Sequence, residues 1–140
     1  DSLIVRPISQ YYPRIVASKG YLEQYGIPKI LEDLSEHHWI LLPQLNANNK
    51  VDLYCKNDRI QIEPKTYHLC DSPMVLLDMI QSGMGIGVFL PSLLPTEMAN
   101  SSLEILFNDW HCEPIVASIV YQSRKHIPLR IKYLIEFLLG

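Results

Sequence analysis

The chain has 140 residues, of which 48% are hydrophobic and 19% are charged. This balance is typical of a folded globular domain and excludes an intrinsically disordered chain, which would be more charged and less apolar. Twelve basic and fifteen acidic residues leave a net charge of −3, which provides no global positive field for holding nucleic acid. Three cysteines are too few, and odd in number, for a secreted disulfide scaffold, so we expect a reducing compartment.

The start of the chain and its apolar runs bear on membrane and export. No apolar run reaches the ~18 residues of a transmembrane helix. The chain begins with Asp1-Ser2-Leu3-Ile4, a start that does not resemble a signal peptide and that lacks an initiator methionine. We therefore expect no membrane span, and we expect this chain to be a piece of a longer protein.

The first half of the chain alternates short strands and helices. The apolar run 3–6 predicts a strand stopped by Pro7, and the run 14–17 predicts a second strand. Ser18 is a typical N-cap for a helix over 19–25. The expected elements that follow are Gly26 as helix terminator, a short helix at 31–34, a buried strand at 39–42, a loop at 44–50, and strands at 51–55, 59–63 and 67–70.

The clearest local signal in the second half is Ser72-Pro73, an N-cap followed by proline at the first helical position. It predicts a helix over 73–82 that Gly83 ends. The buried face of this helix is expected to carry Leu76, Leu77, Ile80 and Met84. Later expected elements are a strand at 86–90, a short helix at 92–98, strands at 103–107 and 115–121, and a C-terminal helix from Pro128 with Ile131, Leu134, Ile135 and Leu138 on one stripe. This alternation predicts an α/β architecture with a mostly parallel or mixed sheet.

The glycines of Gly83-Met84-Gly85-Ile86-Gly87 invite comparison with a nucleotide-binding loop. A dinucleotide fingerprint needs a third glycine where Val88 stands, and it must lie between a strand and a following helix. Here the order is helix, glycines, strand. The pattern favours a helix terminator followed by a tight entry into a buried strand, where side chains do not fit.

Metal and nucleophile signatures are weak. His37 and His38 are adjacent and diverge on a helix, while His68 and Cys70 share one face of a strand without a C-x-x-C or H-E-x-x-H pattern. No G-x-S-x-G occurs. We therefore predict no metal, no cofactor and no enzymatic reaction.

Two polar clusters remain. The basic cluster Arg124-Lys125-His126 lies in a loop, and no helix-turn-helix with a basic second helix follows, so these residues predict no specific DNA binding. At Asp71-Ser72-Pro73, two interpretations stay open. The cluster is either a helix cap alone, or a cap whose free amides also face a ligand.

Five stretches, in order along the chain, resemble the effector-binding domain of LysR-type bacterial transcriptional regulators. They are Asp1–Ile8, Arg14–Leu22, Gly26–His37, Gly83–Pro91 and Ile119–Leu138. Lys19 and Gln122 of this chain stand at positions where the family usually has proline. The resemblance implies a periplasmic-binding-protein-like (type 2) α/β fold of two lobes, joined by two crossing segments with the effector in the cleft. A runner-up is a solute-binding protein of a transporter, which shares the architecture, and an enzyme on the same fold is third.

Carried onto this chain, the resemblance implies one complete lobe and a remnant of the other. Residues 14–113 would form lobe II, residues 1–13 the tail of lobe I and the crossover, and residues 114–140 the return crossover with the last strand and helix of lobe I. The family's N-terminal winged helix-turn-helix, linker helix and opening half of lobe I have no counterpart here. We expect the 115–140 segment to find cover by pairing with 3–6, by packing on another copy, or by exchange between chains.

The implied function is a ligand-sensing domain in the cytoplasm. It would bind a small molecule, commonly an organic acid or aromatic metabolite in this family, and would reach DNA only through an N-terminal domain. We expect a homo-oligomer and no membrane partner. Ser18 and Ser72, at two helix starts, are expected to converge on one crevice and to offer hydroxyls and backbone amides to an anion. The expected effector-binding residues are Ser18, Cys70, Asp71, Ser72, Pro73, Ile86 and Phe89.

Overall fold

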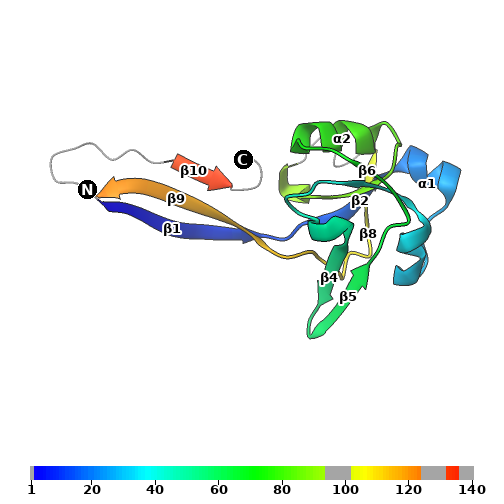
Figure 1. Cartoon of the computed structure of the whole chain (residues 1–140), viewed down its shortest axis with the longest axis horizontal. Coiled ribbons are helices and arrows are strands. Elements are labelled where there is room, and N and C mark those ends of the chain that lie inside the picture. Colours follow the sequence, from blue (N-terminus) through cyan, green and yellow to red (C-terminus); the bar gives the residue numbers. More distant parts are fainter. Residues whose placement is uncertain (1, 94–101, 124–131, 136–140) are drawn as a thin grey trace. The chain divides into compact units, whose positions relative to one another are not determined.

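The computed structural model describes residues 2–93, 102–123 and 132–135. The chain divides into two compact units. One comprises Asp1–Tyr11 and Pro114–Gly140, and the other comprises Tyr12–Glu113 (Figure 1). Within the described ranges, the helices are all too short to cross a lipid bilayer.

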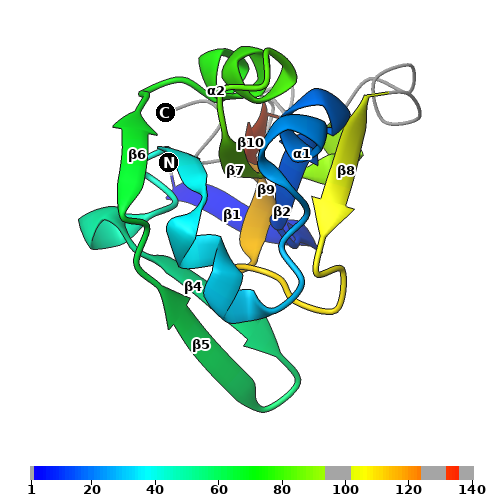
Figure 2. The same ribbon diagram turned by 90° about the vertical axis from the view of Figure 1, so that its right-hand side faces the viewer.

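A five-stranded sheet is the centre of the Tyr12–Glu113 unit, with strand order β6-β3-β7-β2-β8. Its strands are β2 (Arg14–Ser18), β3 (His38–Leu41), β6 (Thr66–Leu69), β7 (Ile86–Phe89) and β8 (Leu103–Leu106). Strands β6, β3 and β7 run parallel, whereas β2 is antiparallel to both of its neighbours, β7 and β8. Figure 2 shows β6 and β8 at the two edges. The predicted mixed sheet is therefore confirmed.

Helix α1 (Lys19–Tyr25) follows β2 directly. The Ser18 hydroxyl accepts a hydrogen bond from the Tyr21 backbone N–H at 3.0 Å, so it caps the helix as predicted. Gly26 ends the helix with φ 91°, a left-handed value that favours glycine. Within the described residues, three short 3₁₀ helices lie in the connections, namely η1 (Leu31–Glu36), η2 (Ala47–Asn49) and η3 (Pro91–Leu93).

Helix α2 (Pro73–Gln81) corresponds to the helix predicted over 73–82 and ends one residue earlier than expected. The Ser72 hydroxyl accepts from the Val75 N–H at 3.5 Å, and Gly83 follows the helix with φ 80°. Three of the four predicted face residues are buried. The fourth, Met84, is 44% exposed because the chain has already turned at Gly83.

The core occupies both faces of the five-stranded sheet. Neighbouring residues of β3 alternate between two hydrophobic clusters, with Trp39 in one and Ile40 in the other, as the two-residue period of a strand requires. The α1-side cluster includes Tyr21, Leu22, Leu34, Trp39, Val51, Leu53 and Ile62. The α2-side cluster includes Val16, Ile40, Leu76, Leu77, Ile80 and Phe89. The α1-side cluster is completed by an antiparallel hairpin of β4 (Val51–Cys55) and β5 (Asp58–Ile62).

The glycines before and within β7 allow close packing. A Cβ on Gly85 would lie 2.8 Å from the His38 carbonyl oxygen, and one on Gly87 would lie 2.7 Å from Cδ1 of Ile80. Both distances are too short for a side chain. This confirms the interpretation as a tight strand entry.

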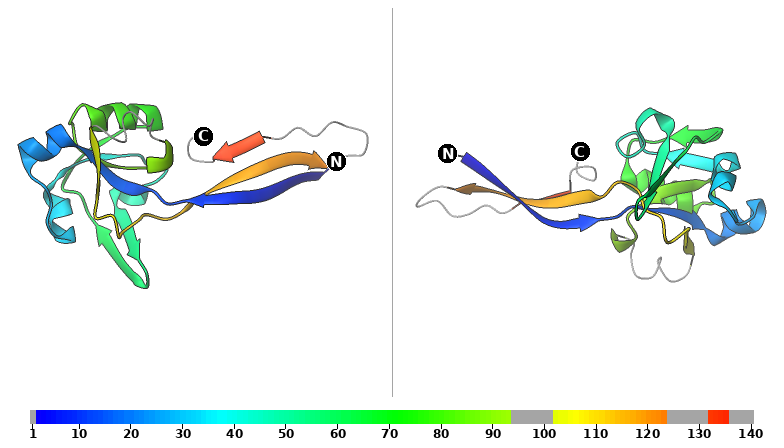
Figure 3. Two further views of the ribbon diagram at one scale, coloured as in Figure 1. Left: turned by 180° about the vertical axis from the view of Figure 1, so that it is seen from behind. Right: turned by 90° about the horizontal axis from the view of Figure 1, so that it is seen from below.

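The first unit, Asp1–Tyr11 with Pro114–Gly140, contains an antiparallel three-stranded sheet of order β1-β9-β10. It comprises β1 (Ser2–Tyr11), β9 (Ile115–Ser123) and β10 (Lys132–Ile135), and Figure 3 shows β1 and β9 side by side. Because residues 3–6 pair with residues of β9, one of the expected forms of cover for the 115–140 segment is present.

Two sequence predictions in this unit are wrong. The first strand does not stop at Pro7 but continues to Tyr11, with a register shift between Pro7 and Ser9 that accommodates the missing N–H. Residues 132–135, predicted as helix, form a strand, because pairing along the edge of β9 outweighs a helical stripe pattern. The rest of that predicted helix, and the helix predicted at 92–98 beyond η3, lie outside the described residues.

Candidate functional site

The carboxyl ends of the three parallel strands lie at one edge of the five-stranded sheet. Leu41 of β3 pairs with Leu69 of β6, and β7 runs in the same direction on the other side of β3. Because β2 is antiparallel, its first residue, Arg14, pairs with Phe89 at the end of β7. We call this the carboxyl edge, defined by Arg14, Leu41, Leu69 and Phe89. Ligands of open α/β sheets bind outside such an edge.

The loop after β6 brings four of the predicted site residues to the carboxyl edge. Cys70 donates its backbone N–H to the Leu41 carbonyl at 3.0 Å, and its thiol lies 3.9 Å from the Ser72 carbonyl oxygen. The Gln44 side-chain amide, from the loop after β3, donates to the Asp71 carbonyl at 3.5 Å. These contacts join two loops at the carboxyl edge.

Exposure and electrostatics differ among these four residues, Cys70 to Pro73. Asp71 is exposed, while the other three are half-buried. Burial raises the pKa of the Cys70 thiol, so the thiol is protonated near neutral pH. The N-terminus of α2, with its partial positive charge, lies at the same position. A hydroxyl, a carboxylate and a helix N-terminus therefore adjoin one another.

Ser18 lies at the opposite end of the strands from the carboxyl edge. The register pairs Val16 with Gly87, so Ser18 lies toward the amino end of β7. Its hydroxyl oxygen is 3.7 Å from the position of a Cβ on Gly83, which follows the C-terminal end of α2, whereas Ser72 precedes the N-terminal end. The prediction that Ser18 and Ser72 converge on one crevice is therefore wrong. Its physical reason is the antiparallel direction of β2, which carries α1 away from the carboxyl edge.

The two predicted site residues of β7, Ile86 and Phe89, also lie at opposite ends of the strand. Phe89 is 5% exposed, belongs to the α2-side cluster and lies at the carboxyl edge. Ile86 has no exposed surface and belongs to the α1-side cluster at the amino end of the strand. The structure thus brings Cys70, Asp71, Ser72, Pro73 and Phe89 to the carboxyl edge, and leaves Ser18 and Ile86 away from it.

Sequence reasoning did not single out Arg14 and Gln44 at the carboxyl edge. The Arg14 guanidinium donates to the backbone carbonyls of Asn108 at 2.6 Å and Trp110 at 3.3 Å, so it holds the loop that follows β8. Gln44 lies two residues after the apolar run 39–42 that forms most of β3. A polar residue just after a predicted strand was the available signal for Gln44, and a charged residue at the first position of a predicted strand was the signal for Arg14.

A surface depression with a volume of about 420 Å³ lies away from the carboxyl edge, between η1 and β5. It is lined by Glu32, Ser35, Ile60, Gln61, Ile62, Glu63, Pro64 and Lys65, none of which is a predicted site residue. Two of its lining residues form ion pairs, Glu63 with Lys50 and Lys65 with Glu36. Among the residues that the structure describes, no group of three or more His, Cys, Asp or Glu side chains is placed to hold a metal ion.

Comparison with known proteins decides the family. The model of the LysR substrate binding domain family matches residues 1–140. The chain belongs to this family. A relative, the HTH-type transcriptional activator AaeR of Escherichia coli K12, is 27% identical over 139 residues, which are 99% of this chain and 45% of the relative. The HTH-type transcriptional regulator PtxR of Pseudomonas aeruginosa is 25% identical, over 88% of this chain and 39% of that protein.

Solved structures of LysR-type regulators share the fold. The full-length Vibrio cholerae virulence activator AphB superposes with a TM-score of 0.75 at 24% identity, covering 91% of this chain and 44% of AphB. The regulatory domain of CrgA from Neisseria meningitidis gives 0.68 at 23% identity, covering 90% and 62%. The predicted periplasmic-binding-protein-like type 2 fold is thus confirmed. The LysR-family chain described here spans less than half the length of the curated relatives it matches.

Proposed function

We propose that this LysR-family chain is the ligand-sensing part of a DNA-binding transcriptional regulator, and that it binds a small metabolite between two lobes. The observation that carries the proposal is the family match over all 140 residues. The relatives named above are transcriptional regulators, which favours this function over a solute-binding protein of a transporter. The domain performs no reaction in this proposal. Instead, the effector shifts a conformational equilibrium that reaches the DNA-binding domain.

We assign residues 14–113 to lobe II, residues 1–13 to the tail of lobe I and the crossover, and residues 114–140 to the return into lobe I. The compact unit at Tyr12–Glu113, with its own two-sided core, supports this assignment. The whole regulator would act in the cytoplasm as a homo-oligomer and would reach DNA through an N-terminal helix-turn-helix, in keeping with the HTH-type names of the relatives.

The effector-binding residues of this lobe are, in our proposal, Cys70, Asp71, Ser72 and Pro73, with Phe89 as the apolar wall at the same edge. The Ser72 hydroxyl and the N-terminus of α2 favour an oxygen-rich, partly negative group. Asp71 disfavours a bare carboxylate directly beside it, and accepts hydrogen bonds from a hydroxyl or amine of the effector. This combination supports an organic acid or aromatic metabolite that carries a second polar group.

The test uses the intact regulator and a panel of aromatic and aliphatic hydroxy acids, with calorimetry or thermal shift as the readout. Ser72→Ala should weaken binding of any hit by about tenfold, as expected for the loss of one or two directed hydrogen bonds. Ser18→Ala is the matched control, because it also removes a helix cap but lies at the opposite edge. Equal losses in both variants would reject the carboxyl edge as the site.

The coding sequence upstream of Asp1 separates the two functions. A helix-turn-helix there supports the regulator, whereas a signal peptide supports the transporter alternative. The oligomeric state is tested by light scattering with Leu134→Asp in β10. We expect a dimer or larger assembly that weakens in the variant, and a monomer whose size ignores the change would contradict the homo-oligomer.

A further inference from the structure

The chain passes between its two units through very few residues. In the first unit, the β1–β9 ladder extends to the pair Tyr11 and Ile115. In the second unit, the Cys112 N–H donates to the Pro13 carbonyl at 2.9 Å, which joins the two connecting segments to each other. Only Tyr12 on one segment, and 113–114 on the other, lie between these two pairings. These three residues form the connection between the units.

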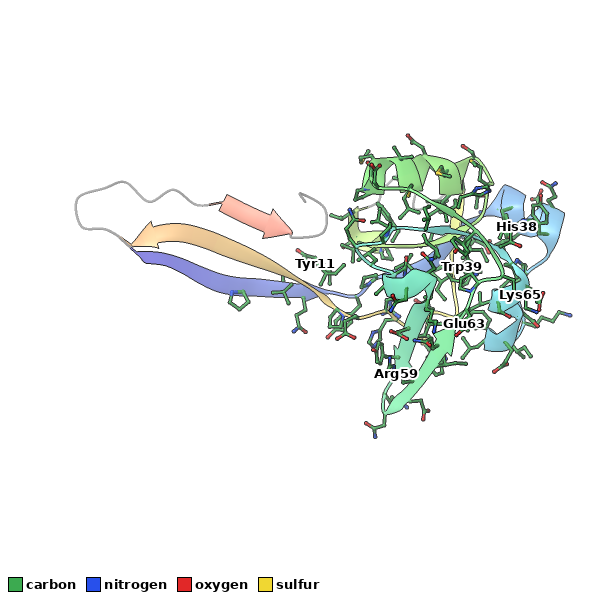
Figure 4. The ribbon with its side chains drawn as sticks, viewed as in Figure 1. Tyr11, His38, Trp39, Arg59, Glu63 and Lys65 are labelled. Atoms are coloured by element: carbon green, nitrogen blue, oxygen red, sulfur yellow. The ribbon has the colours of Figure 1, made fainter. Side chains whose placement is uncertain are left out.

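The β4–β5 hairpin holds the returning segment through Tyr54. The Tyr54 N–H donates to the His111 carbonyl at 2.8 Å, and the His111 N–H donates to the Tyr54 carbonyl at 3.0 Å. Their rings also stack, with centroids 6.2 Å apart and planes inclined by 27°. Arg59 lies on the hairpin, where Figure 4 labels it. Its guanidinium is 5.8 Å from the Tyr54 ring centroid. Tyr54 is thus fixed by its own hairpin and by the returning segment.

Both connecting segments make side-chain contacts that lead to Tyr54. The Tyr12 ring packs edge-on against His111, with centroids 4.8 Å apart, so it reaches Tyr54 through one intervening ring. The Glu113 side chain raises the pKa of the Tyr54 phenol. A single hairpin residue therefore contacts His111 of the returning segment directly and reaches Tyr12 of the other segment through it.

We propose that Tyr54 is a positioning residue that restrains the connection between the two units by holding His111 and, through His111, the side chain of Tyr12. The β4–β5 hairpin then sets how readily the units change their relative angle. Only the biological role of this restraint rests on the proposed function: the restraint would tune the movement between the units that an effector selects. The restraint itself is a property of the Tyr12–Glu113 unit and needs no effector to be measured.

Hydrogen–deuterium exchange of the 140-residue chain tests the restraint. Tyr54→Ala removes the ring and the hydroxyl, and Tyr54→Phe removes the hydroxyl alone. Tyr67→Ala is the matched control, because Tyr67 is a half-exposed tyrosine on the edge strand β6 whose hydroxyl binds Asn49. In Tyr54→Ala, we expect peptides covering 108–116 to exchange about five- to tenfold faster, as the loss of a stacked ring predicts.

Tyr54→Phe should give a smaller increase in the same peptides, and the Tyr67→Ala control should give none. Peptides of α2 should exchange at the wild-type rate in all three variants. Wild-type exchange at 108–116 in Tyr54→Ala would overturn the proposal. An equal increase in α2 would overturn it as well, because it would show general loosening of the unit. None of these outcomes depends on an effector, so the restraint and the proposed function can fail separately.

Discussion

The hydroxyl of Tyr21 and Nδ1 of His37 lie 2.8 Å apart, and the same hydroxyl accepts the backbone N–H of His38 at 3.0 Å. One side chain of α1 thus ties the helix to the residues that open β3. Tyr21 is almost fully buried, and this burial raises its pKa. Burial also lowers the pKa of His37, against the opposing charge of Asp33. The pair is therefore held in its neutral form.

This relationship predicts a stability that falls in mild acid. Below the ordinary histidine pKa of 6.5, the unfolded chain binds a proton that folded His37 resists, so the free energy of unfolding decreases as the pH falls. The decrease ends once the pH passes below the lower pKa of the folded state. Urea unfolding at pH 7.5 and 5.5 measures it. In His37→Asn, whose side chain can still accept from Tyr21, the loss of stability between the two pH values should be smaller, and an unchanged loss would contradict the role of His37.

We predict that adding a side chain at Gly85 creates a clash with the backbone of β3. A Cβ there would meet the His38 carbonyl at 2.8 Å, and neither β3 nor β7 can shift freely within the sheet. We expect Gly85→Ala to destabilise the fold by about 1–3 kcal/mol in chemical denaturation. Gly20→Ala is the control, because its nearest neighbour would be the Ser18 hydroxyl at 4.0 Å. That change should be neutral or stabilise by up to about 1 kcal/mol, and equal losses would show that Gly85 is not specially constrained.

We predict that removing the two helix caps lowers the stability of the fold by different amounts. The Ser18 hydroxyl is buried and 3.0 Å from the Tyr21 N–H, whereas the Ser72 hydroxyl is 3.5 Å from the Val75 N–H near the surface. Ser18→Ala should therefore cost about 1–2 kcal/mol, since it leaves a buried donor unpaired, and Ser72→Ala about 0.5 kcal/mol. Thermal or urea unfolding of the two variants compares them. The reverse order would mean that burial does not strengthen the first cap.

The net charge of −3 predicts that this chain alone does not bind DNA specifically. Titration against the promoter of the intact regulator, at about 150 mM salt, should show no sequence-dependent retention. The intact regulator is the positive control. Tight and sequence-dependent binding by the chain alone would require a base-reading surface within these 140 residues.

The starts of α1 and α2 and the tight backbone packing at Gly85 could be predicted from the sequence. Helix caps such as Ser18 and Ser72 act through hydrogen bonds three residues away, and the burial of Leu76 and Ile80 follows from the period of the helix. These are local relationships, so the order of residues contains them. The same holds for the α/β class, which the alternation of elements determines.

Only the tertiary structure decided which of those local features meet. The pairing of Arg14 with Phe89 sets β2 antiparallel to β7, and it alone moves Ser18 away from Ser72 although both begin a helix after a strand. Likewise, residues 132–135 form a strand because they pair with β9, whatever their helical spacing. Strand direction and pairing depend on hydrogen bonds between residues distant in the chain, and no local pattern in this sequence encodes that choice.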